Sequence, residues 1–277
     1  MKMPALVPAL LLGVSLCVPS ASWAQLSPPN DMGVAFGHVH LAVKDVASAK
    51  TFFTTMLGGK AISNGPIALI EFPGIYVMLR QADAPGAPAG TTVDHFGLVY
   101  KDIAAARARW TAGGVKFDIG EVNKSQGYVF VPNSDIRVEV FGDESLPGEV
   151  SMDHFHLFTA EADMLPMQAW YAKVFGGFAG QRQRVARPGI IEVNYFGRFN
   201  MSFGGGMRKP EGTKGHGVDH IGFEVRDIEA FAKRLEGMGL KFEAPIRLVQ
   251  GAPTKVGFFT DPWGTYIEVT EKLAPQH

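Results

Sequence analysis

Hydrophobic residues along the chain follow two alternating periods. Four segments that each begin at an aspartate carry apolar residues at every third or fourth position, which is typical of one buried helix face. Each aspartate stands where its carboxylate can accept hydrogen bonds from the free amides of a first helical turn. The pattern therefore predicts four helices, with the N-caps Asp45, Asp102, Asp163 and Asp227.

After each helix the period of the apolar residues changes to two. β-branched and aromatic residues stand between Gly, Pro, Asn and Asp, which favours short strands joined by turns. Four hairpins are predicted in this way: residues 68–72 with 75–79, 128–131 with 137–141, 190–195 with 199–203, and 256–259 with 266–269. Together with the helices, they indicate an α+β protein.

The strand before each helix opens on a histidine, in a phrase that recurs four times. Residues 218–222 read Val-Asp-His-Ile-Gly and residues 93–97 read Val-Asp-His-Phe-Gly. Looser copies are Gly-His-Val-His-Leu at 37–41 and Asp-His-Phe-His-Leu at 153–157. Such recurrence indicates repeated structural units. We predict four modules that arose from a duplicated pair, with halves at 36–146 and 150–272.

The composition of the chain limits which partners and which metal ligands it can have. The net charge is −1 and no basic run occurs, so we expect no nucleic-acid partner. The only cysteine, Cys17, lies in an N-terminal segment that we expect to be removed. Any metal site in the mature chain must therefore use imidazole and carboxylate ligands.

Four modules with a histidine opening the first strand and a glutamate closing the last resemble the vicinal oxygen chelate superfamily. This superfamily includes glyoxalase I, extradiol dioxygenases, fosfomycin-modifying transferases and bleomycin-resistance proteins. Residues 261–268, Asp-Pro-Trp-Gly-Thr-Tyr-Ile-Glu, look like its turn before a metal-binding glutamate, and residues 131–139 form a weaker version without the glycine. The resemblance implies four βαβββ modules that pair into two cupped mixed-sheet halves.

The resemblance also implies two sets of metal ligands, one in each half. They are His38, His95 and Glu139 in the first half, and His154, His220 and Glu268 in the second, whose turn is the more complete. Two imidazoles and one carboxylate suit a divalent ion, and Fe(II), Mn and Zn all fit.

Two further histidines lie on the same side of their strands as expected ligands. His40 follows His38 by two residues and His156 follows His154 by two, so each pair points to one sheet face. We expect these histidines to contact a substrate or transfer a proton, with a packing role as the alternative. Glu224 shares a face with His220 by the same argument, with less support.

Departures from the superfamily's patterns narrow the choice of reaction. The tyrosine before the turn of ring-cleaving extradiol dioxygenases is replaced by Phe258, and no histidine lies between His220 and His277. The stretches 76–79 and 200–203 offer no Glu or Gln as the fourth ligand of glyoxalase I. We therefore expect a metal-dependent enzyme of neither type, acting on a small oxygen-bearing molecule. The alternative is a metal-free binding protein of the bleomycin-resistance type.

The N-terminus resembles a secretory signal peptide. Lys2 precedes an apolar run at 10–14, and Ser22-Trp23-Ala24 forms a small-x-small cleavage site. The run is too short for a permanent membrane anchor, so we expect a periplasmic or secreted protein.

Cleavage after Ala24 gives a testable prediction. Intact mass spectrometry of the protein from its native source should show a chain that begins at Gln25. Mature material that retains residues 1–24 would contradict export.

Overall fold

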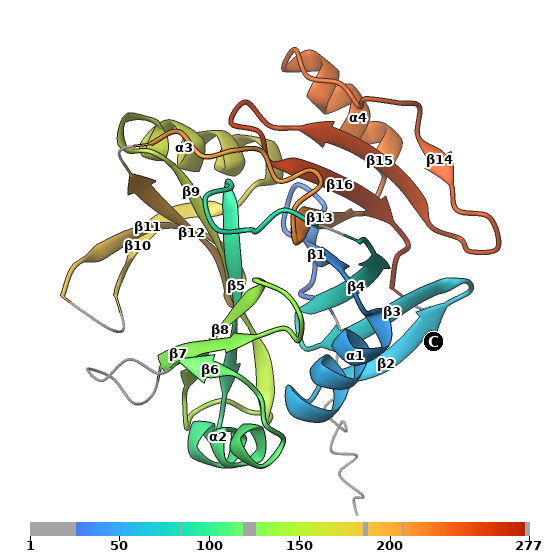
Figure 1. The fold of residues 1–277 in the computed structure, drawn as a ribbon. Coiled ribbons are helices and arrows are strands. Elements are labelled where there is room, and N and C mark those ends of the chain that lie inside the picture. Colours follow the sequence, from blue (N-terminus) through green and yellow to red (C-terminus); the bar gives the residue numbers. More distant parts are fainter. Residues whose placement is uncertain (1–25, 84, 119–125, 185–187, 207, 275–277) are drawn as a thin grey trace, which may run out of the picture.

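A computed structural model describes residues 26–83, 85–118, 126–184, 188–206 and 208–274 (Figure 1). The predicted signal peptide, residues 1–24, lies outside these residues. The described strands are β1 (Val34–Val43), β2 (Lys60–Asn64), β3 (Ile67–Phe72), β4 (Ile75–Gln81), β5 (Val93–Tyr100), β6 (Phe117–Asp118), β7 (Gln126–Phe130), β8 (Arg137–Gly142), β9 (Val150–Ala160), β10 (Phe178–Gln183), β11 (Ile190–Phe196), β12 (Phe199–Gly206), β13 (Val218–Val225), β14 (Arg247–Leu248), β15 (Lys255–Thr260) and β16 (Tyr266–Glu271). The α-helices are α1 (Val46–Thr51), α2 (Ile103–Ala112), α3 (Met164–Phe175) and α4 (Ile228–Gly237).

The four predicted helices and four predicted hairpins are confirmed. Asp45, Asp102 and Asp227 accept hydrogen bonds from the amides three residues later, at 2.8–2.9 Å. The capping prediction is wrong for Asp163, whose side chain makes no capping bond because a 3-10 turn at Glu161–Asp163 leads into α3. None of the helices in the described part of the chain is long and apolar enough to cross a bilayer.

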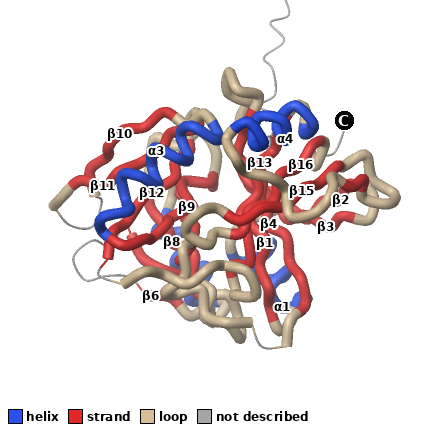
Figure 2. Tube along the Cα trace, turned by 90° about the horizontal axis from the view of Figure 1, so that it is seen from above, coloured by secondary structure: helices blue, strands red, loops and turns tan. Residues whose placement is uncertain are grey.

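The strands form two eight-stranded mixed sheets, which confirms the predicted α+β class with four βαβββ modules in two cupped sheets. One sheet has the order β14-β15-β16-β13-β1-β4-β3-β2 and the other β10-β11-β12-β9-β5-β8-β7-β6. At the centre of each, the first strands of two modules pair antiparallel, β1 with β13 and β5 with β9. Figure 1 shows the second sheet in green and yellow beside the first, and Figure 2 shows the same division from above.

The sheets do not combine the modules that we expected to pair. The first and fourth modules share one sheet and the second and third share the other, so both sheets draw strands from both sequence halves. The two linkers that carry the chain between sheets run together. The Gly217 amide donates to the Gly86 carbonyl at 2.7 Å, the Gly86 amide donates to the Gly215 carbonyl at 3.2 Å, and the Thr92 amide donates to the Glu211 carbonyl at 3.0 Å. The division into halves at 36–146 and 150–272 stays a prediction about how the chain arose.

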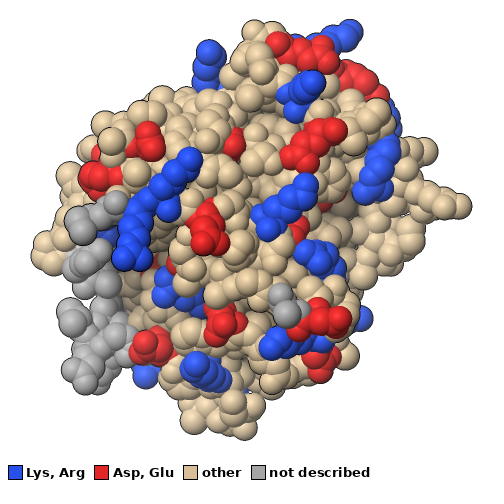
Figure 3. All heavy atoms as spheres, turned by 45° about the horizontal axis from the view of Figure 1, so that its top comes forward, with Lys and Arg blue, Asp and Glu red and all other residues tan. Residues whose placement is uncertain are grey.

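The core lies on the helix-covered faces of the two sheets and is continuous between them. Phe36 of β1 meets Phe155 of β9 edge-to-face at 5.3 Å, and Phe175 of α3 stacks on Phe223 of β13 at 3.8 Å. Trp110 and Tyr171 are fully buried, as their helical positions predicted. The opposite faces of the two sheets, which the helices do not cover, remain available for a binding or catalytic site. On the molecular surface in Figure 3, acidic and basic side chains interleave.

Candidate functional site

The central antiparallel strand pairs bring histidines from two modules together. In the β1–β13 pair, His38 lies opposite Gly222, and in the β5–β9 pair His154 lies opposite Gly97. A Cβ atom on Gly222 would collide with the His38 ring, and one on Gly97 with the His154 ring. The glycine in each Asp-His-x-Gly phrase therefore leaves room for a histidine from another module.

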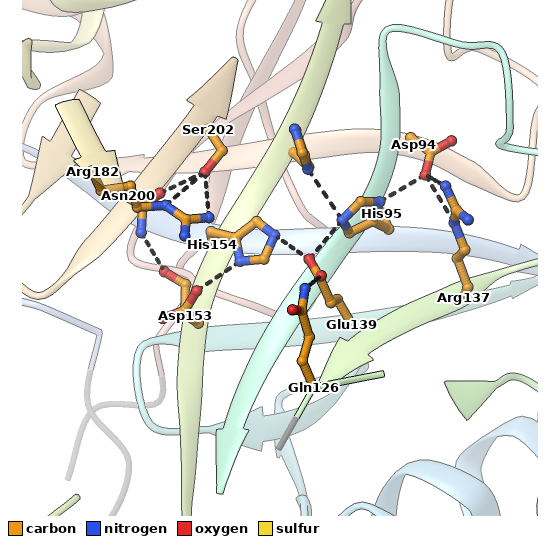
Figure 4. Close-up of polar contacts among 11 residues, drawn as sticks. Asp94, His95, Gln126, Arg137, Glu139, Asp153, His154, Arg182, Asn200 and Ser202 are labelled. Carbon is orange, nitrogen blue, oxygen red and sulfur yellow. Dashed lines mark hydrogen bonds and ion pairs between the residues drawn. The ribbon is translucent and has the colours of Figure 1, made fainter. Parts of the chain in front are cut away.

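The β5–β9 site consists of His95, Glu139, His154 and His156. Oε2 of Glu139, on β8, lies 3.0 Å from Nε2 of His95 and 3.1 Å from Nε2 of His154. Nδ1 of His156 lies 3.3 Å from Nε2 of His95. One ligand atom from each of the four residues lies within 4.8 Å of all the others. Figure 4 shows His95 and His154 pointing to Glu139 from opposite sides.

Aspartates behind the histidines fix which ring nitrogen carries hydrogen. Nδ1 of His95 donates to Asp94, and Nδ1 of His154 donates to Asp153, both at 2.7 Å. A neutral ring that donates through Nδ1 has a lone pair at Nε2, and both lone pairs then face the carboxylate of Glu139. Three acceptors directed at one point require a proton or a cation between them.

The geometry of this cluster fits a divalent ion. Metal–ligand bonds of about 2.1 Å place neighbouring ligand atoms ~3.0–3.4 Å apart, close to the contacts of Glu139 with the two rings. His154 Nε2 is buried, and the Glu139 carboxylate lies 3.1 Å from it, as expected of a nitrogen that can serve as a ligand beside a second ligand. We conclude that the residues present suit a metal with two imidazole ligands and one carboxylate.

The charges of the cluster are strongly coupled in the metal-free protein. Burial alone would lower the pKa of His154, but its hydrogen bonds with Asp153 and Glu139 raise that pKa to about 9. Burial opposes ionisation of Glu139, yet hydrogen bonds from His154 and His95 hold its pKa far below the usual range. His156 behaves oppositely, because burial and repulsion by His95 and His154 lower its pKa well below the ordinary value.

The β1–β13 site repeats this arrangement with His38, His220 and Glu268. Oε2 of Glu268 lies 2.8 Å from Nε2 of His38 and 2.9 Å from Nε2 of His220. Nδ1 of His220 donates to Asp219 at 2.8 Å, and Nδ1 of His40 lies 3.1 Å from Nε2 of His220. Burial and repulsion by His220 and His38 lower the pKa of His40 to about 3. His40 therefore lies beside the β1–β13 cluster as His156 lies beside the β5–β9 cluster, and the pKa of each ring is lowered.

The predicted ligand sets are wrong in their grouping. All six residues enter a cluster, but His38 joins His220 and Glu268, while His154 joins His95 and Glu139. The exchange follows from the sheets, since one cluster straddles the central strand pair of modules one and four and the other that of modules two and three. Glu224 belongs to neither cluster, because its carboxylate accepts from the Thr270 hydroxyl and the Leu273 amide.

Sequence reasoning overlooked Tyr128, Gln126 and Arg137 in the β5–β9 site. The Gln126 amide donates to Glu139, and Arg137 donates to Asp94 at 2.9 Å while lying over the Tyr128 ring. A positional signal for Tyr128 existed: it stands four residues before Pro132, as Phe258 stands four before Pro262. The tyrosine that we found missing in the second half is thus present in the first.

The turn that precedes Glu139 closes without the glycine that we expected to matter. Asn133 adopts a left-handed conformation with φ 56°, which asparagine tolerates better than most residues. The Val131 amide donates to the Ile136 carbonyl at 2.9 Å, as the Asp261 amide does to Thr265. The weaker motif therefore still positions its glutamate.

The two sites differ in access. The β5–β9 site opens into a cavity of about 310 Å³, whose lining includes His95, Tyr128, Glu139 and His156. Beside the β1–β13 site, Tyr76 and Met78 of β4 pack with Leu273 from the segment after β16. The chain thus covers with its own C-terminal segment the sheet region next to one site and leaves a cavity at the other.

Comparisons with known proteins agree with this geometry. The profile of the Glyoxalase/Bleomycin resistance protein/Dioxygenase superfamily matches residues 35–123 and 92–269. The chain belongs to this superfamily. The profile thus covers both sites, and the superfamily includes metalloenzymes as well as resistance proteins. No curated protein sequence gives a significant match.

Solved structures support the fold of this superfamily member. Glyoxalase I from Zea mays is similar at a TM-score of 0.67 and 17% identity, over 86% of this chain and 92% of that one. A Bacillus subtilis protein assigned to the dioxygenases is similar at a TM-score of 0.63 and 14% identity, over 89% and 87% of the two chains. At these identities the likeness concerns the fold alone.

We predict that Gly97→Ala removes metal from the β5–β9 site only. The added methyl group would displace the His154 ring and break the ligand set. After reconstitution with Zn²⁺, metal analysis should fall from about two ions per chain to about one. Gly237→Ala in α4 is the matched control, because its Cβ would meet no atom within 4 Å. A folded Gly97→Ala protein that keeps the full metal content would refute the assignment.

Metal affinity at the β5–β9 site should rise with pH up to about 9. His154, with its pKa of about 9, is protonated at neutral pH in the metal-free protein and must lose that proton to bind an ion. Titration calorimetry at pH 7 in buffers of different ionisation enthalpy should show release of about one proton per ion at this site. Affinity that stays constant between roughly pH 6 and 9 would contradict this coupling.

Proposed function

We propose that the protein is a metal-dependent enzyme that acts on a small oxygen-bearing molecule at the β5–β9 site. The observation that carries the proposal is the convergence of His95, His154 and Glu139 on one point beside an open cavity. A protein that only sequesters a ligand has no need for two aspartate-oriented imidazoles aimed at one carboxylate. The proposed reaction is of the dioxygenase, lyase or isomerase kind.

His95, His154 and Glu139 would hold Fe(II), Mn or Zn, all of which accept imidazole and carboxylate ligands. Such an ion would supply Lewis-acid polarisation of oxygens on the substrate. Asp94 and Asp153 keep the two imidazoles in the required tautomer through their bonds to Nδ1. Arg137 in turn neutralises Asp94.

His156 and Tyr128 are the proton-transfer groups that we propose. The lowered pKa of His156 keeps its imidazole neutral at neutral pH, so the ring can accept a proton. Burial and the nearby Glu139 carboxylate raise the pKa of Tyr128, so its hydroxyl stays protonated and can donate to a developing oxyanion. Both residues line the same cavity.

His40 would have a corresponding role in the β1–β13 site, which we propose as a second metal position of unassigned activity. Its lowered pKa likewise keeps the ring neutral. The periplasmic or secreted location belongs to this proposal too and rests on the N-terminal sequence alone.

The test compares wild-type protein with Glu139→Gln, each reconstituted with Fe(II), Mn²⁺ or Zn²⁺. Products from catechols, diols, 2-hydroxy acids and 2-ketoaldehydes are followed by mass spectrometry. Turnover should depend on metal and fall by more than about a hundredfold in Glu139→Gln, because the only carboxylate ligand is lost. Glu144→Gln, at an exposed position after β8, is the control and should keep full activity. Ligand binding that is unaffected by chelators, without any product, would instead favour a metal-free binding protein.

A further inference from the structure

Three arginines line the cavity of the β5–β9 site: Arg137, Arg182 and Arg184. Arg137 is neutralised by its ion pair with Asp94. Neither Arg182 nor Arg184 forms an ion pair with any residue that the structure describes. Glu192, near Arg182 on the next strand, accepts from Gln181 instead, at 2.7 Å.

Polar neighbours hold Arg182 in a defined position. Its Nη2 and Nε atoms donate to Oγ of Ser202 at 3.0 and 3.3 Å. The Ser202 hydroxyl is fully buried and donates to Asn200 at 2.9 Å. Figure 4 shows Arg182, Ser202 and Asn200 beside His154, on the side of the cluster away from Arg137. A cation anchored on neutral partners keeps its charge available to a ligand.

This cation stands close to the reacting end of the cavity. Ser202 accepts the hydrogen bonds from Arg182, and it lies opposite His156 on the neighbouring strand β9. Gly204 continues the same strand and lines the cavity, and a Cβ there would press against the Phe158 ring. The missing side chain at 204 therefore leaves room for the Phe158 ring beside His156.

The sheet that carries the β1–β13 site shows that the fold does not require an arginine at the position of Arg182. Arg182 is the fifth residue of β10, and the fifth residue of β2 is Asn64. The Asn64 amide donates to the carbonyls of Lys272 and Leu273, both at 3.0 Å, and so binds the C-terminal segment. The same position holds the chain's own backbone in one sheet and lines an open cavity as a cation in the other.

We propose that the β5–β9 site takes an anionic substrate, a small molecule whose carboxylate, phosphate or phosphonate group binds Arg182, with Arg184 adding positive charge. This inference rests on the proposed function for the placement of the substrate's other oxygens at the metal position. Arg182 presents a planar fork of donors that matches the oxygens of such a group.

The experiment uses glycolate and its neutral analogue glycolamide, which differ in one charge. Their affinities are measured by ligand-observed NMR for the full-length mature protein, both metal-free and loaded with Zn²⁺. Wild-type protein should prefer glycolate, and Arg182→Gln should weaken glycolate binding by about ten- to a hundredfold while leaving glycolamide unchanged. Arg182→Lys keeps the charge but loses the planar fork of donors, so its glycolate affinity should lie between those of wild type and Arg182→Gln. Arg247→Gln, at an exposed position on β14 of the other sheet, should change nothing.

Every outcome of this experiment either supports or refutes the anion site. Equal binding of the two ligands by wild-type protein, no glycolate binding in either state, or unchanged glycolate binding by a folded Arg182→Gln protein would overturn the anion site. If Arg182→Gln does not fold, Arg182→Lys and the preference of wild type for glycolate still decide. Failure of Zn²⁺ to load would defeat the proposed metalloenzyme, whereas a preference for glycolate in the metal-free protein would still support the anion site.

Discussion

The structure depends on one close approach, a histidine ring lying over a glycine across each central strand pair. His38 occupies the space above Gly222, and His154 the space above Gly97. This contact allows two modules to share one sheet while each contributes an imidazole to a common carboxylate. Without it, the ring would have to leave the cluster or the strands would have to separate. The ligand geometry and the continuity of the sheet therefore have a single steric origin.

Buried charge is the second constraint on both sites. In the β5–β9 site, the buried carboxylates of Asp94 and Glu139 and the partly exposed Asp153 surround two buried imidazoles. Buried ion pairs gain stability only when their remaining hydrogen-bonding positions are satisfied, which Arg137 and Gln126 help to achieve. Protons hold this cluster together in the metal-free protein, and an ion can replace them. Metal binding and proton release are thus two sides of one equilibrium.

The two sheets carry similar clusters with different surroundings. In the sheet of the β1–β13 site, Asn64 binds the segment after β16, whereas the β5–β9 site has Arg182 at that position. One sheet region beside a cluster is therefore covered by the C-terminal segment, and the other lines a basic cavity. Each cluster contains two histidines and one glutamate with similar geometry, so the side chains around them, rather than the candidate ligands, distinguish the two sites.

The sequence by itself determined the elements, the four modules and the six residues that enter the two clusters, because periodicity, caps and the recurring histidine phrases are local signals. Tertiary structure alone decided which residues meet. Each His-x-His strand has two compatible partners of the Asp-His-x-Gly kind, and the phrases are too alike to choose between them. In the folded chain, the linkers around Gly86 and Gly217 run together where the chain crosses between sheets, a contact far apart in sequence that no local signal predicts. The cavity arginine could not be predicted either, since an alternating strand does not reveal which of its cations lack a carboxylate.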